Sequence, residues 1–456
     1  MKNNHNQLAH GLKSRHVELM ALGGAIGTGL FLGAGQSIRF TGPSLIIAYL
    51  IAGLAFFLLM RALGELLMTN PNAGSFIDFV TKYLGPKTGF VSGWVYWICW
   101  ITMAMADITA SGLYIKYWFP GVPPWITALV ILLILFILNS AYVSAFGEAE
   151  FWFALVKIIA IVILIITGII MVVSNFRTSA GHANVNNLVN YGFFAHGFKG
   201  FFLSFQMIAF SFTGIEMIGM TASETQNPRK ELPRCINSVP TRILLFYVGS
   251  LLALMCIYPW NHISASSSPF VQVFQNVGIR SAASIINFVV LTAALSSCNS
   301  GIYTTSRMIF SMNKHSKSKL GQFMRTLSKH QVPTRAVGLS VITIAIAIIL
   351  NLFMPKGIFT LITSMSTTCF LFIWIVIILT HLKYRKMTKP KAPDFEIPGY
   401  PFSDYFVLFF MFMVAFILIF QTKTFMALMG SIILFIFLYL GRIIYSYINH
   451  SGKSFK

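Results

Sequence analysis

The chain has 456 residues, of which 56% are hydrophobic and only 10% are charged, whereas soluble globular domains carry about 25% charged residues. This composition excludes a soluble enzyme or binding domain and indicates an all-α polytopic membrane protein. The formal net charge of +21 would suit a nucleic-acid-binding protein, but the basic residues lie in short connections between apolar runs, so no nucleic acid partner is expected.

Apolar runs long enough to cross a hydrocarbon core of about 30 Å, which takes roughly 20 helical residues, recur along the whole chain. In chain order, we predict twelve transmembrane helices at 17–38, 43–66, 89–115, 124–144, 148–174, 200–221, 241–259, 283–311, 336–354, 358–381, 405–421 and 424–447. Nearly all Lys and Arg fall in alternate connections, most densely in 313–335 and 381–391. The positive-inside rule therefore places both termini in the cytoplasm, with the bundle in the plasma membrane.

The spans group into two sets of five followed by two more. The predicted order is a cytoplasmic tail (1–16), a first transmembrane repeat (17–174), an extracellular loop (175–199), a second repeat (200–381), a cytoplasmic loop (382–404), two further helices (405–447) and a cytoplasmic tail (448–456). The weakly amphipathic segment 70–89 predicts a short helix on the cytoplasmic surface. The sequence gives no indication of an oligomeric state.

The first span contains "GGAIGTGLFLGAG" (23–35), in which six of thirteen residues are glycine. Glycine costs about 1 kcal/mol relative to alanine in a helix interior. We predict that the helix unwinds at Gly27-Thr28-Gly29, and that the half-helix beginning there binds a carboxylate with its positive dipole end. For Gly33 and Gly35, close helix packing is an equally good explanation.

The sixth span has a matching interruption in "IAFSFTGIEMIGM" (208–220), with Thr213-Gly214 at its centre. Paired interrupted helices at corresponding positions of two halves are typical of transporters that bind substrate at the membrane midplane. Backbone carbonyls released in mid-membrane need partners, and the ammonium of an amino acid can supply them. The carbonyls predicted for this role belong to Ala25, Ile26, Phe210, Ser211 and Thr213.

Seven stretches carry a resemblance to a known family. They are "GGAIGTGLFLGAG" (23–35), "GPS" (42–44), "RALGEL" (61–66), "FGEAEFWFALVK" (146–157), "FSFTGIEMIG" (210–219), "NPRKELPR" (227–234) and "LSSCNSGIYTTSRM" (295–308). Over residues 10–450 the chain resembles the bacterial amino acid transporters of the amino acid–polyamine–organocation superfamily. Three further stretches most resemble the members of that family that carry D-serine, D-alanine and glycine: 105–120, 244–261 and 268–301.

The resemblance implies a LeuT-like five-plus-five inverted repeat with helices 1 and 6 broken, plus two C-terminal helices. It also implies alternating-access, proton-coupled symport of small neutral amino acids: D-alanine, D-serine, glycine and L-alanine. The substrate carboxylate would bind Gly27, Thr28 and Gly29, and the ammonium would bind the carbonyls of Ala25, Phe210 and Thr213. The Phe210 ring would close over the substrate. The remaining predicted substrate-site residues are Ile26, Asp107, Ser211 and Gly214.

Lys157 lies nine residues beyond the predicted start of its span at 148, close to the midplane. A buried ammonium is costly there, so Lys157 should pair with an anion or release its proton. In related transporters a lysine at this position resembles a substitute for a bound sodium ion. The lysine would then link helices one, five and eight. The alternative is a lysine that snorkels to the cytoplasmic surface. Ser296, Ser297 and Asn299 are predicted to face it, unless they serve only as hydrogen-bonding links between helices.

Asp107 and Glu216 are the other two acids predicted within the site. In the family that this chain resembles, many members have glutamate at the position of Asp107, which is the shorter acid. Asp107 could accept a proton, limit the size of the pocket or pair with a cationic substrate, or it could simply lie near the outer interface. Glu216 follows the interruption of the sixth span and suits either a proton relay or a hydrogen bond to released backbone.

A further set of charged residues falls at predicted cytoplasmic helix ends, where inner-gate ion pairs and plain solvated termini are equally good interpretations. These residues are Glu65, Glu148, Glu150, Glu224, Arg229, Arg234 and Arg307.

Other functional classes are less well supported. An intramembrane enzyme would need a metal cluster or catalytic dyad, but the histidines fall in loops or at span ends and no H-E-x-x-H motif or nucleophile elbow is present. A channel would need a ring of like charges or a repeated filter. No metal or cofactor is expected, because the proton gradient would drive transport. The serious alternative is a permease for cationic or GABA-like amino acids, or an exchanger; a cationic substrate should be lost on Asp107→Asn.

Overall fold

The computed structural model describes residues 26–70, 75–141, 143–217, 219, 228–265, 267–313, 318–329, 331–353, 357–388 and 395–451, without the side chains of 143–147, 149, 228 and 444–451. Within these ranges the structure is almost entirely helical. The two strands described there are β1 (Arg177–Thr178) and β2 (Gly181–His182), which form one antiparallel hairpin. The predicted all-α membrane fold is confirmed.

The first half of the chain forms one π-helical segment, one short 3-10 turn and six α-helices before the hairpin. They are η1 (Gly29–Gly33), α2 (Ala34–Thr41), η2 (Gly42–Ser44), α3 (Leu45–Thr69), α4 (Phe76–Leu84), α5 (Pro86–Ile115), α6 (Pro124–Ala141) and α7 (Val143–Val173). After the hairpin come η3 (Val185–Leu188), α8 (Gly197–Ser211), η4 (Ile215–Met217), α10 (Pro228–Asn237), α11 (Val239–Arg242), η6 (Ile243–Gly249), α12 (Ser250–Ile257), η7 (Trp260–His262) and α13 (Pro269–Asn276). The last elements are α14 (Arg280–Met312), α15 (Lys319–Met324), α16 (Thr334–Phe353), α17 (Ile358–Thr388), α18 (Phe402–Ile417), η8 (Leu418–Phe420) and α19 (Thr422–Ser451).

The described residues contain eleven stretches that are long and apolar enough to cross a membrane. The count differs from twelve because the first two predicted spans form one stretch, 29–69, which bends at Gly42. Gly42 has φ +63°, and a side chain there would meet Ala195 at 3.2 Å. The Ser44 N–H donates to the Phe193 carbonyl at 2.9 Å, so the bend is held by the segment that precedes α8. The five-plus-five repeat remains a prediction.

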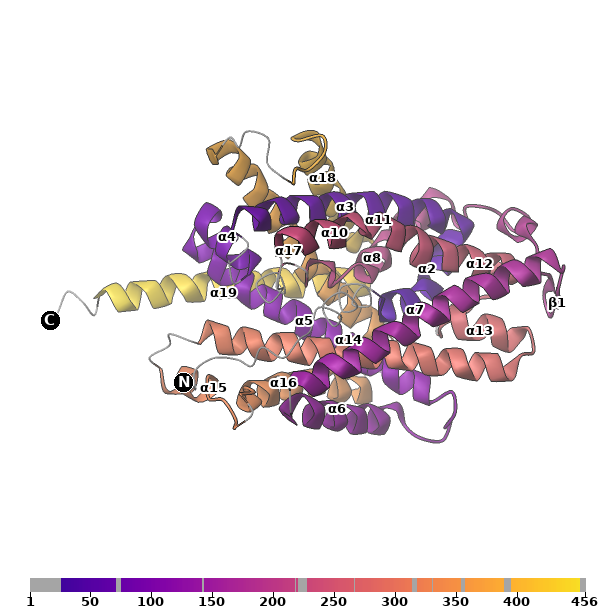
Figure 1. Ribbon diagram of the computed structural model, residues 1–456, viewed down its shortest axis with the longest axis horizontal. Coiled ribbons are helices and arrows are strands. Elements are labelled where there is room, and N and C mark those ends of the chain that lie inside the picture. The colour runs from indigo at the N-terminus through magenta and orange to yellow at the C-terminus, as the bar shows by residue number, and fades with distance from the viewer. Residues whose placement is uncertain are drawn as a thin grey trace.

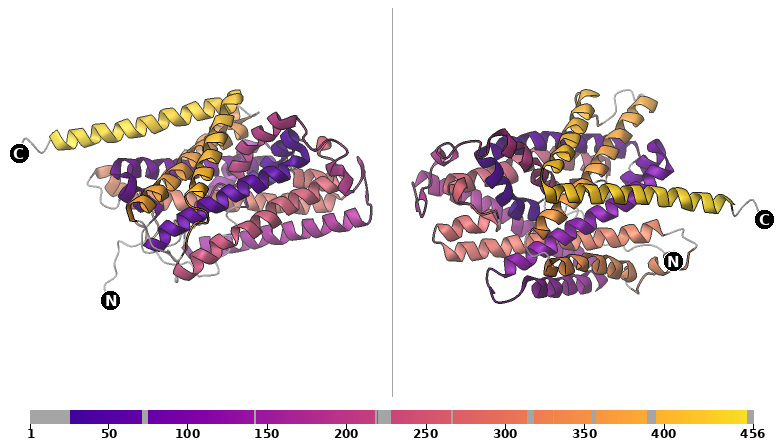
Figure 2. Two further views of the ribbon diagram at one scale, coloured as in Figure 1. Left: turned by 90° about the horizontal axis from the view of Figure 1, so that it is seen from above. Right: turned by 180° about the vertical axis from the view of Figure 1, so that it is seen from behind.

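Figure 1 shows most of the long helices running side by side along the longest dimension of the molecule. The short helices α4 and α15 lie at one end, and the β1–β2 hairpin lies at the other. These are the segments predicted for the cytoplasmic and outer faces, respectively, so the two predicted sets of connections are at opposite ends. The C-terminal helix α19 follows one side of the bundle and extends beyond it (Figure 2).

Helix α5 occupies the centre of the bundle and has its most extensive contacts with α14 and α17. The peripheral helices instead expose large apolar side chains, including Ile137 (67% exposed) on α6, Val173 (82%) on α7 and Phe437 (72%) on α19. Such a surface would be unstable in water and fits the hydrocarbon of a bilayer. Buried polar residues, in contrast, occur on α5 and on the helices packed against it, and the candidate site lies there.

Candidate functional site

The helical run of α8 ends in the middle of the bundle. Its last residue is Ser211, and Gly214 in the following turn has φ +89°, a conformation that glycine adopts without a steric cost. The Phe212 and Thr213 N–H groups donate three residues back, to the carbonyls of Ala209 (3.0 Å) and Phe210 (3.1 Å). The chain then continues as the single 3-10 turn η4. The interruption predicted at Thr213-Gly214 is present.

The first interrupted segment begins its described course at Ile26, and Ala25 lies outside the described residues. Gly27 is in a bend and helical structure starts at Thr28. The Phe31 N–H donates to the Gly27 carbonyl at 3.2 Å, and the following turn is the wider π form, η1. Helical structure therefore starts at the predicted position, and the segment that would form the other half of this span lies outside the described residues.

The two interrupted segments touch through their backbones at Gly29. A Cβ on Gly29 would lie 2.6 Å from the Cα of Ser211, whereas a Cβ on Gly27 would make an ordinary contact of 3.6 Å with the Ser297 hydroxyl. At Gly33 a Cβ would meet the Met207 sulfur at 2.6 Å. Gly29 and Gly33 thus allow close packing against α8, and Gly29 does so at the site itself.

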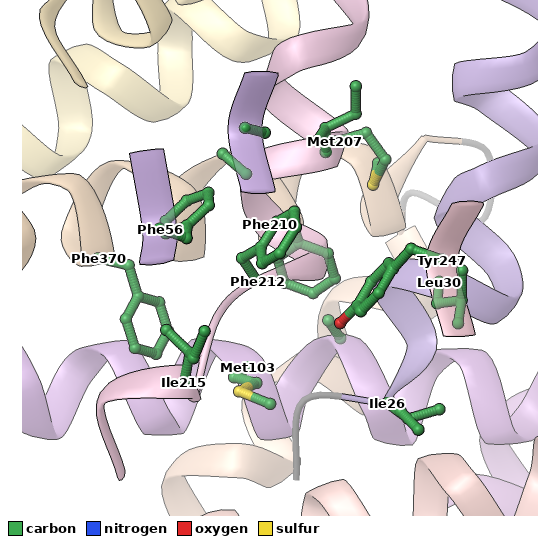
Figure 3. Close-up of a cluster of buried hydrophobic side chains, with 14 of the residues drawn as sticks. Ile26, Leu30, Phe56, Met103, Met207, Phe210, Phe212, Ile215, Tyr247 and Phe370 are labelled. Atoms are coloured by element: carbon green, nitrogen blue, oxygen red, sulfur yellow. The ribbon is translucent and has the colours of Figure 1, made fainter. Parts of the chain in front are cut away.

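A small pocket lies between the two interruptions and α5. Its free space is close to that of a single water molecule. Seven uncharged residues line it: Gly27, Thr28, Gly29, Met103, Phe210, Ser211 and Thr213. The close-up in Figure 3 shows Met103 on α5 across from Phe210 and Phe212 at the end of α8. All of the lining residues except Met103 are among those predicted from the sequence, whereas Met103 carries no sequence signal beyond its apolar side chain.

Aromatic side chains fix the end of α8. Phe212 stacks between Phe56, at 4.5 Å between ring centroids, and Tyr247, at 5.0 Å. The Phe210 ring, which is 2% exposed, meets Phe359 of α17 edge to face at 6.4 Å. Phe210 lines the pocket, and its closure over a bound substrate remains a prediction.

Two of the carbonyls predicted for the ammonium already accept hydrogen bonds. The Tyr247 hydroxyl donates to the Ser211 carbonyl at 2.9 Å. The Phe210 carbonyl accepts from the Thr213 N–H at 3.1 Å and from the Thr213 hydroxyl at 2.7 Å. Groups that a helix break releases in a membrane are satisfied locally wherever a hydroxyl is within reach. An ammonium at Phe210 would therefore have to displace the Thr213 hydroxyl.

Asp107 is buried directly behind the pocket wall and does not line the pocket. The Thr28 hydroxyl donates to its Oδ1 at 2.7 Å, and the Ser297 hydroxyl faces the same carboxylate. Asp107 is 1% exposed, which rules out the interpretation as an acid at the outer interface. Thr28 thus connects the pocket to a buried acid.

Lys157 of α7 is fully buried, which excludes the snorkelling interpretation. Its ammonium donates to the hydroxyl of Ser296 on α14 at 2.9 Å. Two carboxylates act on it electrostatically, Glu150 and Asp107. Lys157 is therefore linked to the predicted helix-eight residues, and through Asp107 to Thr28.

Glu150 is the principal residue of this region that sequence reasoning misplaced. It is 1% exposed, and its Oε1 accepts a hydrogen bond from the Ser296 hydroxyl. Asn299 also faces the Glu150 carboxylate, and the Asn299 Oδ1 accepts from the side-chain amide of Asn139 at 2.7 Å. Glu150 is thus not a solvated helix end. The missed signal is its spacing of two helical turns from Lys157, which puts both on one face of α7.

Glu216 is fully buried beside the turn that interrupts α8. The Trp374 indole donates to its Oε2 at 3.1 Å, and the Tyr96 hydroxyl and the Gly214 N–H face the carboxylate. Contact with released backbone agrees with the structural interpretation, and a role as proton relay remains a prediction.

A second group of buried charges lies at the end of the bundle that carries α4. Arg385 pairs with Glu65 at 2.5 Å, and the ring of His381 bridges Glu65 (3.2 Å) and Asp404 (2.8 Å). The interpretations of Glu65 as a solvated terminus and of His381 as a span end are wrong, because both side chains are buried. Helix α17 continues to Thr388, and the Ile397 N–H donates to Glu65 at 2.9 Å. Arg234, in contrast, is exposed beside Glu231.

Other members of the predicted cytoplasmic set behave differently. Arg229 is exposed, Glu148 is half-buried, Arg307 lies over the Tyr303 ring at 3.1 Å, and Glu224 lies outside the described residues. The three of these residues that the structure describes do not line the pocket.

A bundle of apolar helices with a buried, uncharged pocket between the interruption that follows α8 and the helix that starts at Thr28 is the arrangement of a multi-pass membrane transporter. The particular family follows from comparison with known proteins: the amino acid permease family model matches residues 16–454. The chain therefore belongs to the amino acid permease family.

Relatives of known name cover nearly the whole chain. The amino-acid permease AapA of Bacillus subtilis (strain 168) is 52% identical over 435 residues, 95% of this chain and 94% of that protein. The uncharacterized transporter YdgF of the same organism is 52% identical over 443 residues, 96% of each chain. The D-serine/D-alanine/glycine transporter of Escherichia coli (strain K12) is 42% identical over 442 residues, 95% of this chain and 93% of that one. The named relatives are transporters, as the fold indicates.

Proposed function

We propose that this permease is a proton-coupled symporter that imports small neutral amino acids, namely D-alanine, D-serine, glycine and L-alanine, by alternating access. The observation that carries the proposal is the pocket: it is small and uncharged, and it is formed by the backbones of two interrupted segments. Such a site suits a zwitterion whose side chain is short. The name of the Escherichia coli relative supports the same substrate class.

The pocket also weighs against a cationic substrate. None of the seven lining residues is acidic, and a cationic side chain buried without a counter-charge is strongly unfavourable. Asp107 lies behind Thr28 and does not line the pocket, and its Oδ1 already accepts the Thr28 hydroxyl. A cationic amino acid is therefore the alternative substrate, and competition by L-arginine would reveal it.

In this proposal the carboxylate of the substrate binds the N–H groups at Gly27, Thr28 and Gly29, at the positive end of the half-helix. The ammonium binds carbonyls of the turn that follows α8, where it replaces the hydrogen bond from the Thr213 hydroxyl to the Phe210 carbonyl. Proton coupling runs through the buried polar side chains behind the pocket: Thr28 contacts Asp107, and Lys157 acts on Asp107 and Ser296. Protonated Lys157 holds η1, α7 and α14 in the substrate-binding arrangement, and both termini face the cytoplasm.

The proposal is tested by uptake of labelled D-alanine into proteoliposomes with an inside-alkaline pH gradient. Unlabelled glycine, D-serine, L-alanine and L-arginine serve as competitors. We expect gradient-dependent uptake that the three neutral amino acids block and L-arginine does not. Uptake that ignores the gradient would contradict coupling, and competition by L-arginine would indicate a cationic substrate.

Met103 is expected to set the upper size limit of the substrate. It is 5% exposed and is the one long, flexible aliphatic side chain in the pocket lining. Met103→Ala should admit larger neutral amino acids such as valine or leucine, raising their affinity about tenfold, while glycine loses less than about threefold because it does not reach this wall. Competition assays with both amino acids measure the ratio. Met105→Ala, on the half-buried face of the same helix, is the control.

A further inference from the structure

A buried carboxylate and a buried ammonium on α7 share one hydroxyl of α14. Ser296 Oγ accepts a hydrogen bond from Lys157 Nζ at 2.9 Å and donates one to Glu150 Oε1. All three side chains are 1% exposed or less. This is a continuous hydrogen-bonded path from Lys157 to a second titratable group.

The direction of the path follows from the helix. Glu150 precedes Lys157 on α7 by two turns, roughly 10 Å along the axis at 1.5 Å per residue. It therefore lies nearer the start of α7 at Val143, and that end of the helix is opposite the β1–β2 hairpin. In the predicted topology Glu150 is on the cytoplasmic side of Lys157.

Apart from Lys157, the described groups that face Glu150 are polar and uncharged. From α14 it is faced by Ser296, Asn299 and Ser300, and Asn299 is in turn bonded to Asn139 of α6. Among the described residues, the charged groups that act on Lys157 are Glu150 and, from α5, Asp107. Removing one member of a buried pair leaves the other charge uncompensated, so the protonation of Lys157 and that of Glu150 depend on each other.

We propose that Glu150 is the proton acceptor of Lys157 on the cytoplasmic side, with Ser296 as the relay; this rests on the proposed proton-coupled function. One N–H proton of the Lys157 ammonium moves to Ser296 Oγ as the Ser296 hydroxyl proton moves to Glu150 Oε1. The ion pair becomes a neutral amine and a neutral carboxylic acid, and no atom is gained or lost. Glu150 then releases its proton toward the cytoplasm. The step removes the charge from Lys157 after the substrate has been delivered.

The test compares two activities of purified protein in proteoliposomes: D-alanine accumulation driven by a pH gradient, and exchange of labelled for unlabelled D-alanine at equal pH. Glu150→Gln should reduce accumulation at least tenfold and keep exchange within about threefold of wild type, because exchange needs no net proton release. Glu150→Asp, which restores a carboxylate, should recover part of the accumulation. Glu231→Gln, at a partly exposed acid on α10, is the matched control and should match wild type.

A second pair of variants keeps the test decisive if Glu150→Gln does not fold. Ser296→Ala removes the relay hydroxyl and should lower accumulation far more than exchange, whereas Ser296→Thr keeps the hydroxyl and should stay coupled. Wild-type accumulation in Glu150→Gln or in Ser296→Ala would overturn the inference. If the wild-type protein exchanges D-alanine but ignores the pH gradient, the proposed coupling itself fails, which is a separate result.

Discussion

Replacing Lys157 by alanine is expected to abolish concentrative uptake while the protein remains folded and inserted. The side chain is fully buried and bonded to Ser296, so no solvent cation can take its place. If one proton is carried per amino acid, a gradient of one pH unit holds about 1.4 kcal/mol, enough for a tenfold accumulation of substrate. In Lys157→Ala the accumulation ratio should fall to about one, because the group that passes its proton through Ser296 to Glu150 is then missing.

The measurement is the steady-state ratio of internal to external D-alanine in proteoliposomes, with equal amounts of reconstituted protein confirmed by size exclusion. Lys199→Ala serves as the control, because Lys199 is exposed near the start of α8. It should accumulate substrate as the wild type does. Retained gradient-driven accumulation in Lys157→Ala would contradict the coupling role of Lys157 and, with it, the proton path to Glu150.

Much of the architecture could be predicted because it follows from local chemistry. Apolar runs of spanning length have few alternatives in a membrane. Most described helix ends fall within a few residues of the predicted limits; the exceptions are α8, which ends at Ser211 before the predicted interruption, and α17, which continues to Thr388. The interruption at Gly214 was predictable because Gly214 is flexible and follows a polar threonine in mid-membrane. The burial of Lys157 followed from its depth in the span.

The parts that could not be predicted depend on contacts between distant segments. Whether the Ser211 carbonyl is free depends on Tyr247, 36 residues further along the chain. Glu150 and Glu65 resemble solvated helix ends until α14 and α17, respectively, are placed against them. Met103 belongs to the pocket only because α5 crosses both interruptions. A hydrophobicity profile describes the depth of a residue in the membrane, but it does not contain these partners.

Gly29→Ala is expected to abolish substrate binding, lowering the affinity for glycine or D-alanine at least tenfold, about 1.4 kcal/mol. The added methyl carbon would lie 2.6 Å from the Cα of Ser211, and neither backbone can rotate away as a side chain could. The two interrupted segments must therefore separate. The N–H groups at Gly27 to Gly29 would then no longer face the turn of α8, and the two ends of the zwitterion would lose their common site.

Two other glycines test whether the backbone contact is the cause. Gly27→Ala adds the same methyl group to the pocket wall but meets only the Ser297 hydroxyl, at 3.6 Å, so it should weaken binding less than Gly29→Ala. Gly338→Ala on α16 meets nothing within 4 Å and should leave binding unchanged. Labelled glycine binding to the purified variants gives the three affinities. If Gly29→Ala binds as tightly as Gly338→Ala, contact between the two interrupted helices is not what forms the site, and the pocket between them has another use.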